Sequence, residues 1–127
     1  MIFVDTNVLM YAVGREHPLR QEARDFFIEH AASGEVLVTS AEVLQELLHA
    51  YVPVGRMQAL DAALDLARAR MGELWPIEPD DVALARTLLE AHRALGARDL
   101  LHLACCMRRG VKRAKTFDRA LAAAFEG

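Results

Sequence analysis

The sequence predicts an α/β fold with a doubly wound, mainly parallel sheet of four to five strands and helices on both faces. Short apolar stretches alternate along the chain with longer segments whose apolar residues recur at helical spacing. Strands joined by helical crossovers form parallel sheets that are covered on both faces. A chain of 127 residues with 54% hydrophobic composition is long enough for one substantial core. We therefore expect residues 1–127 to form a single domain.

The first residues predict a strand and two helices. Ile2–Val4 is a short apolar strand, and Asp5-Thr6-Asn7 supplies capping side chains for a helix that ends near Gly14. Pro18 suits the first turn of the next helix. Proline lacks a backbone N–H, and an N–H at that position would have no partner within the helix. That helix is predicted to end at Gly34.

The middle of the chain predicts a second strand and two further helices. Glu35–Thr39 is the strand, and Thr39 followed three residues later by Glu42 is a capping-box pattern. The helix that starts there is expected to run to about Tyr51. The next helix covers roughly Met57–Met71.

The last third of the chain predicts two weaker strands among three helices. Glu73–Ile77 is expected to be an edge strand because it contains Pro76. Asp80 or Asp81 is the expected cap of a long amphipathic helix that extends to Leu95. The remaining elements are a helix from about Arg98 to Arg109, a polar strand near Val111 to Lys115, and a final helix after Thr116-Phe117-Asp118.

Four acidic residues stand out because each lies on a helix or at a helix start, just after a short apolar stretch. They are Asp5, Glu46, Asp99 and Asp118. Ligands of open parallel sheets bind outside the carboxyl ends of the strands. Carboxylates that converge there repel one another unless a hard divalent cation neutralises them, which favours magnesium or manganese. Each aspartate taken alone is equally compatible with a helix cap, so the hypothesis rests on the set.

Helical geometry separates Glu46 from its neighbour Glu42. At about 100° per residue, Glu46 lies near the edge of the apolar face, whereas Glu42 points away from it. The apolar face is formed by Val43, Leu44, Leu47, Leu48 and Tyr51. Glu46 is therefore the candidate ligand, and Glu42 is assigned to the helix cap.

The charge of the chain is unevenly distributed. The formal net charge is −3, yet residues 86–119 carry nine basic and three acidic side chains, a net charge of +6. A basic segment that also contains Asp99 and Asp118 suits a metal-dependent enzyme that acts on a polyanion. The same pattern is also compatible with a solvated helix face and an edge strand protected by charge.

The cysteines and the hydropathy pattern bear on location. Cys105 and Cys106 are adjacent within an apolar helical stretch, which suits neither a mutual disulfide nor a zinc site. We interpret them as buried packing residues in a reducing compartment. No segment is long enough to cross a bilayer and no leader pattern precedes the first strand, so a cytoplasmic, soluble protein is expected.

Four motifs together resemble the PIN domain, a small metal-dependent ribonuclease fold. The motifs are VDTNVLMY at the first strand, SAEVLQEL around Glu46, ARDLLHLA around Asp99, and the TFD that ends in Asp118. Their order and spacing resemble the family across the whole chain. The chain length and the TFD ending are similar to the toxin component of VapBC-type toxin–antitoxin pairs. The polar strand near residues 111–115 departs from the apolar strand usual there.

The resemblance implies a PIN-like fold, a homodimer, Mg²⁺ or Mn²⁺, and endonucleolytic cleavage of single-stranded or structured RNA, restrained by a cognate antitoxin protein. It implies metal ligands and catalytic groups at Asp5, Glu46, Asp99 and Asp118. Thr6, Asn7 and Thr116 would contact metal-held water or phosphate. His102, one helical turn after Asp99, is interpreted as a core histidine, with a hydrogen bond to Asp99 as the alternative.

Two other functional classes remain open. One is a PIN-like module that binds RNA or a protein partner without cutting, although the presence of all four acids argues against it. The other is a metal-dependent phosphatase or a phosphotransfer receiver. The haloacid-dehalogenase type of phosphatase requires a second acid two residues after the first, where this chain has Asn7. A receiver requires paired acids near the first strand, and these are not evident.

Overall fold

A computed structural model describes residues 1–126 of the chain. Four parallel strands form a single sheet in the order β3-β2-β1-β4. The strands are β1 (Ile2–Val4), β2 (Leu37–Ser40), β3 (Glu73–Trp75) and β4 (Ala114–Lys115). The helices within the described residues are α1 (Thr6–Val13), α2 (Pro18–Ser33), α3 (Ala41–Tyr51), α4 (Met57–Arg70), α5 (Pro79–Leu88), α6 (Ala97–Arg108) and α7 (Arg119–Glu126).

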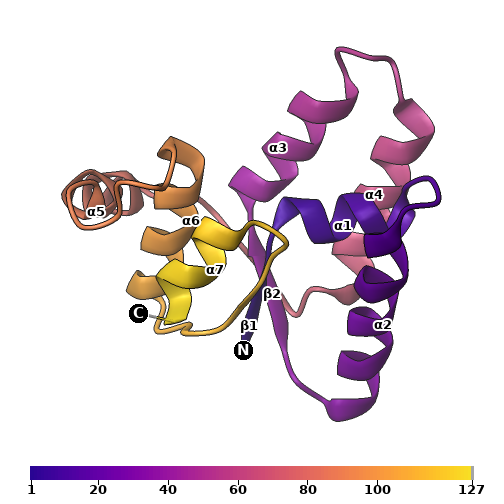
Figure 1. Ribbon diagram of the computed structural model, residues 1–127, viewed down its shortest axis with the longest axis horizontal. Helices are drawn as coiled ribbons and strands as arrows, with labels where there is room; N and C mark the ends of the chain where they lie inside the picture. Colours follow the sequence, from indigo (N-terminus) through magenta and orange to yellow (C-terminus); the bar gives the residue numbers. More distant parts are fainter. Residues whose placement is uncertain (127) are drawn as a thin grey trace.

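The sheet confirms the predicted doubly wound α/β class. The chain passes from β1 outward to β2 and β3, and then returns to place β4 on the other side of β1. This reversal of strand order next to β1 creates a crevice at the carboxyl ends of β1 and β4, where open sheets bind ligands. In Figure 1, α1, α2 and α4 lie on one side of the sheet and α5, α6 and α7 on the other.

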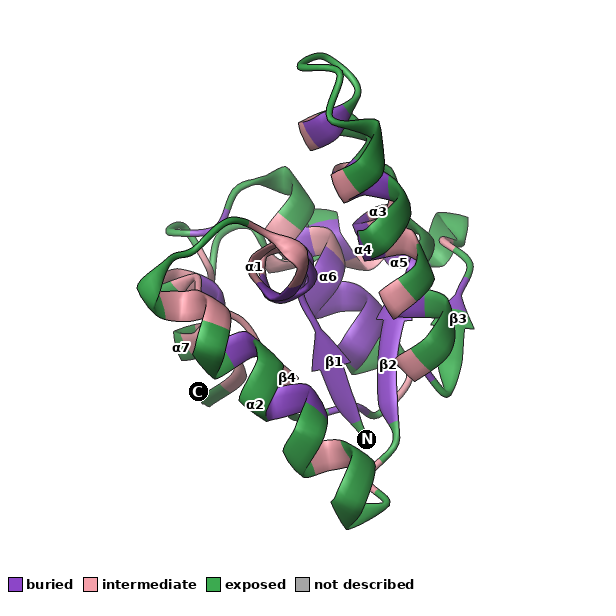
Figure 2. Cartoon of the chain, turned by 90° about the vertical axis from the view of Figure 1, so that its right-hand side faces the viewer, coloured by how far each residue is buried: buried purple, intermediate pink, exposed green. Residues whose placement is uncertain are grey.

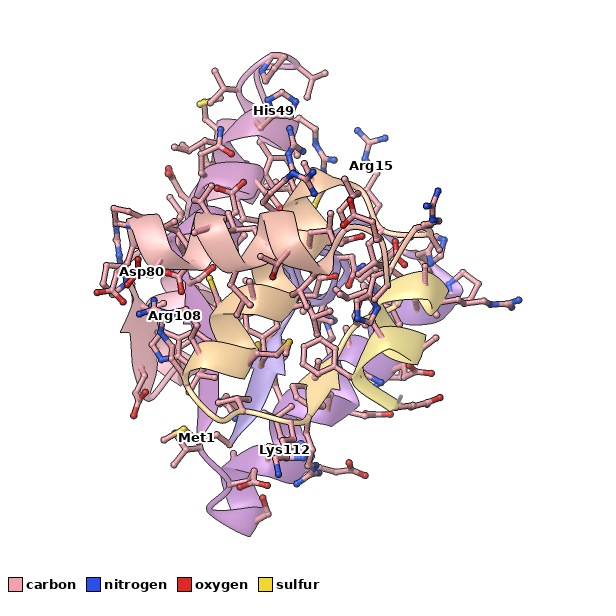
Figure 3. All side chains as sticks on the ribbon, turned by 90° about the vertical axis from the view of Figure 1, so that its left-hand side faces the viewer. Met1, Arg15, His49, Asp80, Arg108 and Lys112 are labelled. Carbon is pink, nitrogen blue, oxygen red and sulfur yellow. The ribbon has the colours of Figure 1, made fainter. Side chains whose placement is uncertain are left out.

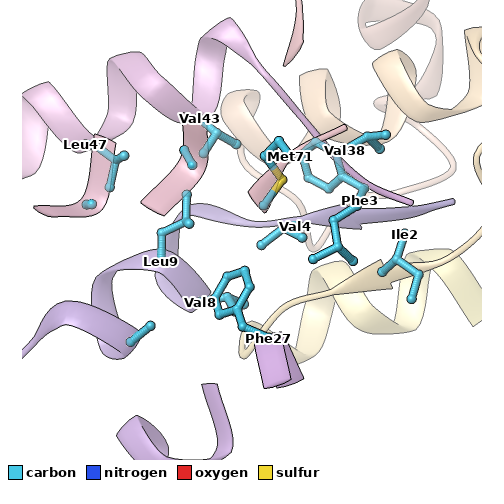
Figure 4. Close-up of a cluster of buried hydrophobic side chains, with 14 of the residues drawn as sticks. Ile2, Phe3, Val4, Val8, Leu9, Phe27, Val38, Val43, Leu47 and Met71 are labelled. Atoms are coloured by element: carbon cyan, nitrogen blue, oxygen red, sulfur yellow. The ribbon is translucent and has the colours of Figure 1, made fainter. Parts of the chain in front are cut away.

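The main core lies between the sheet and the helices α1 to α4. The strands β1 and β2 are buried along their whole length, as the purple ribbons of Figure 2 show. Figure 4 shows the side chains of Phe3, Val4, Leu9, Val43 and Leu47 packed together in this layer. A second, smaller apolar cluster joins α5, α6 and α7.

The helix α3 begins differently from the predicted capping box. The strand β2 extends to Ser40, which becomes the N-cap of α3 without a side-chain hydrogen bond. Thr39 is fully buried in the strand, and its hydroxyl donates to the carbonyl of Val4, 2.8 Å away. The Thr39–Glu42 prediction was therefore wrong, because the strand pairing engages Thr39 one residue too early for capping.

The helix predicted to reach Leu95 ends earlier, at Leu88. The chain then makes two turns that bury Leu95 among Leu100, Leu103 and Leu121. The cap prediction was right in part, because Asp81 contributes to the capping box of α5 although it is not the N-cap. Glu78 is the N-cap of α5, and its backbone N–H donates to the carboxylate of Asp81, 2.8 Å away.

Other expectations about local structure are confirmed. The helix α2 has Pro18 in its first turn and ends at Gly34, whose φ of 74° belongs to the left-handed region that favours glycine. Cys105 and Cys106 are free and buried. Within residues 1–126, no helix combines the length and the apolar character that a bilayer crossing requires.

Candidate active site

A cavity of about 590 Å³ is formed where the helices α1, α3 and α6 begin or pass above the carboxyl ends of the strands. Asp5, Glu46, Asp99 and Asp118 all line this cavity, which we call the acidic cavity. Thr6 and Asn7 line it as well, whereas Glu42 does not. The other lining residues are Met10, His49, Ala50, Gly96, Ala97 and Arg98.

Asp5 is held in place by both the backbone and the side chains around it. It directly follows β1, and its backbone N–H donates to the carbonyl of Lys115 in β4. As N-cap of α1, its side chain accepts a hydrogen bond from the N–H of Thr6 at 2.8 Å. The hydroxyl of Thr116 donates to the other carboxylate oxygen at 2.6 Å. The carboxylate is thus fixed at the switch point of the sheet with only 5% of the residue exposed.

Asn7 ties the N-terminal motif to the last loop. Its amide nitrogen lies 3.3 Å from Asp5 Oδ2, and its carbonyl oxygen accepts the N–H of Phe117 at 3.2 Å. Thr116 also accepts the N–H of Asp118 at 3.0 Å. Asp118 caps α7 in turn, accepting the N–H of Leu121 through Oδ1. These bonds bring Asp118 to the cavity that Asp5 lines, although β4 is only two residues long.

Glu46 is bound on both of its carboxylate oxygens. The Nε2–H of His102 donates to Oε1 at 2.9 Å, and the hydroxyl of Thr6 donates to Oε2. Burial disfavours the charged carboxylate, but the hydrogen bond and the charge of His102 outweigh it, so the pKa of Glu46 lies below its ordinary value. Glu46 likewise raises the pKa of His102 against the effect of burial.

His102 belongs to the site, which the sequence interpretation did not anticipate. The side chain is fully buried, as expected of a core histidine, but its partner is Glu46 rather than Asp99. Its Nε2 lies 3.7 Å from Asp5, and its Nδ1 has no hydrogen-bond partner within the described residues. A histidine on the apolar face of a helix needs a polar partner, and this requirement was the signal available in the sequence.

Two carboxylates of the acidic cavity, Asp5 and Asp99, resist ionisation. Burial raises the pKa of Asp99 to about 6, and the negative charges of Asp5 and Asp118 act in the same direction. Burial also raises the pKa of Asp5, and the favourable effects of His102 and of the bond from Thr116 offset it only in part. A divalent cation would relieve this repulsion, because it favours the ionised form of every neighbouring carboxylate.

A family model decides the identity of the fold, since the PIN domain model matches residues 2–125. The chain belongs to the PIN domain family. This confirms the resemblance drawn from the four motifs.

Curated relatives of this PIN domain are VapC ribonucleases. Ribonuclease VapC23 of Mycobacterium tuberculosis is 66% identical over 125 residues, which cover 98% of each chain. Ribonuclease VapC13 of the same organism is 42% identical over 119 residues, covering 94% of this chain and 91% of the relative. The match to both relatives is close to full length, so the VapC-type character expected from the sequence is confirmed.

Two solved structures share the fold of this PIN domain. The crystal structure of Mycobacterium tuberculosis VapC20, a Sarcin-Ricin loop cleaving toxin, superposes with a TM-score of 0.79 at 23% identity, covering 98% of this chain and 95% of that one. VapBC2 from Rickettsia felis, bound to a DNA fragment from its promoter, gives a TM-score of 0.64 at 22% identity, with coverage of 87% and 83%. At these identities the likeness shows the fold.

Proposed function

We propose that this PIN domain is a magnesium- or manganese-dependent endoribonuclease and the toxin of a toxin–antitoxin pair. The observation that carries the proposal is the convergence of Asp5, Glu46, Asp99 and Asp118 on one cavity. The ribonuclease relatives support the substrate class. The toxin assignment is supported by the structural neighbours, which are a toxin and a VapBC complex.

The residues of the acidic cavity fit a hard divalent cation. Carboxylate oxygens are the ligands that magnesium and manganese prefer. One ligand atom each from Asp5, Glu46 and His102 lies within 4.8 Å of the other two. The Nε2 proton of His102 is donated to Glu46, so the histidine holds that carboxylate in position rather than binding the ion itself. Asp5 and Asp99 would bind the ion directly, with Glu46 and Asp118 completing the set.

A bound cation would supply Lewis acidity and lower the pKa of a coordinated water for attack on the phosphodiester. The protein orients its own groups for this chemistry. Thr116 and Asn7 hold Asp5, and Thr6 and His102 hold Glu46. These fixed hydrogen bonds keep the carboxylates in place before any substrate arrives, which reduces the reorganisation that the reaction requires.

The raised pKa of Asp99 predicts how metal binding depends on pH. Ionising Asp99 costs more in the folded than in the unfolded protein, so its contribution to the stability of the metal-free protein is present below about pH 4 and lost as the pH rises through about 6. A cation reverses this loss. We expect the increase in Tm caused by magnesium to be larger at about pH 7.5 than at about pH 5. Equal increases at both pH values, measured by circular dichroism, would contradict the assignment, and Asp99→Asn should flatten the dependence.

Arg98 is the arginine that lines the acidic cavity, and it is exposed. The four carboxylates repel the negatively charged backbone of RNA, so a positive side chain at the rim of the cavity would favour binding. A guanidinium group binds phosphate through charge-assisted hydrogen bonds. We expect Arg98→Ala to raise the KM for RNA roughly 5- to 20-fold, the loss of one charge-assisted contact, with a smaller effect on kcat. Arg93→Ala is the matched control, because Arg93 is also exposed but does not line the cavity. A change in KM of the same size in both variants would argue for a general charge effect.

We also propose that this domain forms a homodimer, binds a cognate antitoxin protein and acts in the cytoplasm. Exposed apolar side chains at the end of α3 and the start of α4 support the dimer, because such a group seldom stays in water. They are Leu48, Val52, Val54 and Met57. Light scattering of Val54→Asp against the unchanged protein tests this surface, and a dimer in both would place the interface elsewhere.

The experiment that tests the proposed function is cleavage of labelled RNA by the purified protein with magnesium, with manganese and with chelator. Cleavage that requires a metal supports the nuclease. Metal binding without cleavage would favour a module that binds RNA or a partner. Hydrolysis of a phosphomonoester such as p-nitrophenyl phosphate, without RNA cleavage, would favour the phosphatase.

A further inference from the structure

A second cavity of about 360 Å³ lies beside the acidic cavity. It is bounded by the end of α1, the loop to α2, and the end of α3. Its walls include Asn7, Met10, Tyr11, His17, Tyr51 and Arg56. We call it the aromatic cavity, because two tyrosines and a histidine supply much of its lining. Nothing in the proposed metal chemistry uses this cavity.

The two cavities are neighbours in the structure. Asn7 and Met10 line both of them, so the two cavities are adjacent. Figure 3 shows Arg15, which lines the aromatic cavity, and His49, which lines the acidic cavity, at the same end of the molecule. A strand of nucleic acid that presents a phosphate to the acids therefore places an adjoining nucleotide next to the aromatic cavity.

The rings of the aromatic cavity pack against neighbouring side chains. Tyr11 and His17 lie with their ring centroids 4.6 Å apart, and the Arg56 guanidinium lies 5.5 Å from the centroid of the Tyr51 ring. His17 is the N-cap of α2, and its Nδ1 accepts the N–H of Leu19 at 3.1 Å. The neutral ring therefore carries its proton on Nε2, where it is free to serve as a hydrogen-bond donor.

Cations accompany these rings. Arg15 and Arg56 line the aromatic cavity and form no ion pair with any residue of the described chain. Glu16 adds a carboxylate acceptor to the same wall. Flat aromatic and guanidinium groups stack on bases, while the donors and the acceptor recognise base edges, which is how proteins read unpaired RNA. Unpaired arginines beside them suit the phosphates that flank the base.

We propose that the aromatic cavity binds one nucleobase of the RNA substrate, next to the phosphate that the acidic cavity cleaves. The proposal rests on the proposed ribonuclease function and adds a specificity-determining subsite to it. The base stacks against the Arg56 guanidinium, and the His17 Nε2–H and the Glu16 carboxylate contact its edge. The identity of this base then sets part of the sequence preference of cleavage.

The test uses RNA with a missing base. A random-sequence RNA pool cut by the protein with magnesium supplies a substrate with a mapped cut site. Each nucleotide flanking that site is then replaced, one at a time, by an abasic residue. Stacking of one base predicts that one such replacement raises KM at least about fivefold. The double variant His17→Asn, Arg56→Gln should remove that penalty, and asparagine preserves the N-cap acceptor of α2. Arg93→Gln serves as control and should retain the penalty.

The possible results separate the two proposals. If the unchanged protein cuts no RNA, both fail. If it cuts RNA but no flanking abasic residue matters, or if the double variant keeps the full penalty, the subsite alone is wrong. A double variant that keeps the penalty but binds the antitoxin more weakly would identify the cavity as a protein-binding site instead.

A second measurement does not depend on the stability of the double variant. The Asp99→Asn variant, which should bind RNA without cutting it, is mixed with RNA in which one nucleotide flanking the cut site is 2-aminopurine. Stacking in the aromatic cavity predicts quenched fluorescence on binding at that position and not at more distant ones. Unchanged fluorescence at every flanking position would overturn the proposal.

Discussion

Asp99→Asn is expected to abolish RNA cleavage, with a loss of kcat of about 10³-fold or more. Asparagine has nearly the same shape as aspartate but removes one of the four charges that would hold the cation. A bound cation would stabilise the charge of the transition state by several kcal/mol, and each 1.36 kcal/mol corresponds to about a tenfold change in rate. The measurement is single-turnover cleavage of the mapped RNA with saturating magnesium.

The same variant should fold as well as the unchanged protein. Removal of a carboxylate whose pKa is raised to about 6 relieves repulsion with Asp5 and Asp118, so the metal-free protein should gain stability near neutral pH. Asp61→Asn is the matched control, because Asp61 is exposed on α4 and lies outside the acidic cavity. A folded Asp99→Asn protein that still cuts RNA at the normal rate would refute the assignment of this carboxylate.

Asp81→Ala is expected to lower the free energy of unfolding by about 3–5 kcal/mol. Asp81 is fully buried, and its Oδ1 lies 2.7 Å from Arg109 Nη1 and 2.8 Å from Arg108 Nη1. Arg109 also lies 5.0 Å from the Trp75 ring centroid and donates to the carbonyl of Cys105. Alanine would leave this partly buried guanidinium with only the half-exposed carboxylate of Glu78, 3.1 Å away, which compensates the loss of the buried partner incompletely. Urea unfolding at neutral pH measures the loss.

The Asp80 side chain provides the control for this prediction. Figure 3 shows Asp80 beside Arg108, and a distance of 3.8 Å separates their charged groups, but Asp80 is largely exposed. Exposed pairs contribute about 0–1 kcal/mol, so Asp80→Ala should change little. Equal effects of the two substitutions would mean that burial of Asp81 adds nothing to stability.

The pairing of Asp81 with the two arginines also predicts that acid lowers the stability of the protein. Burial of Asp81 favours its neutral form, but the hydrogen bonds from Arg109, the Glu78 N–H and Arg108 outweigh this and hold the pKa well below its ordinary value. The stabilisation is therefore present above about pH 4 and lost as the pH falls below it. The unchanged protein should lose more stability than the Asp81→Ala variant over that range.

The parallel sheet and the positions of the four acids at one cavity could be predicted from the sequence because both depend on local patterns. Ile2–Val4 is apolar at every position, and Asp5 follows it directly, so strand and cap were visible together. Glu46 was distinguished from Glu42 by the angle around a single helix, and Glu46 alone lines the acidic cavity. Such inferences need no knowledge of how distant segments pack.

The partners that join distant segments could not be predicted in the same way. The bond between His102 and Glu46 spans 56 positions, and it depends on how α6 packs against α3. Tertiary packing also overrides local capping signals. Thr39 lies in β2 instead of capping α3, and α5 ends early, at Leu88. The pairing of Asp81 with Arg108 and Arg109, at the end of α6, likewise joins residues 27 and 28 positions apart.

The bonds between the first and last motifs have a consequence for protein synthesis. Thr116 donates to Asp5 across 111 positions, and Phe117 donates to Asn7 across 110. While the ribosome is still translating, a growing chain has Asp5 exposed without these partners, and Asp118 has not yet been added. The four carboxylates of the acidic cavity therefore come together only after residue 118 has been synthesised, so the cavity cannot assemble on a shorter, unfinished chain.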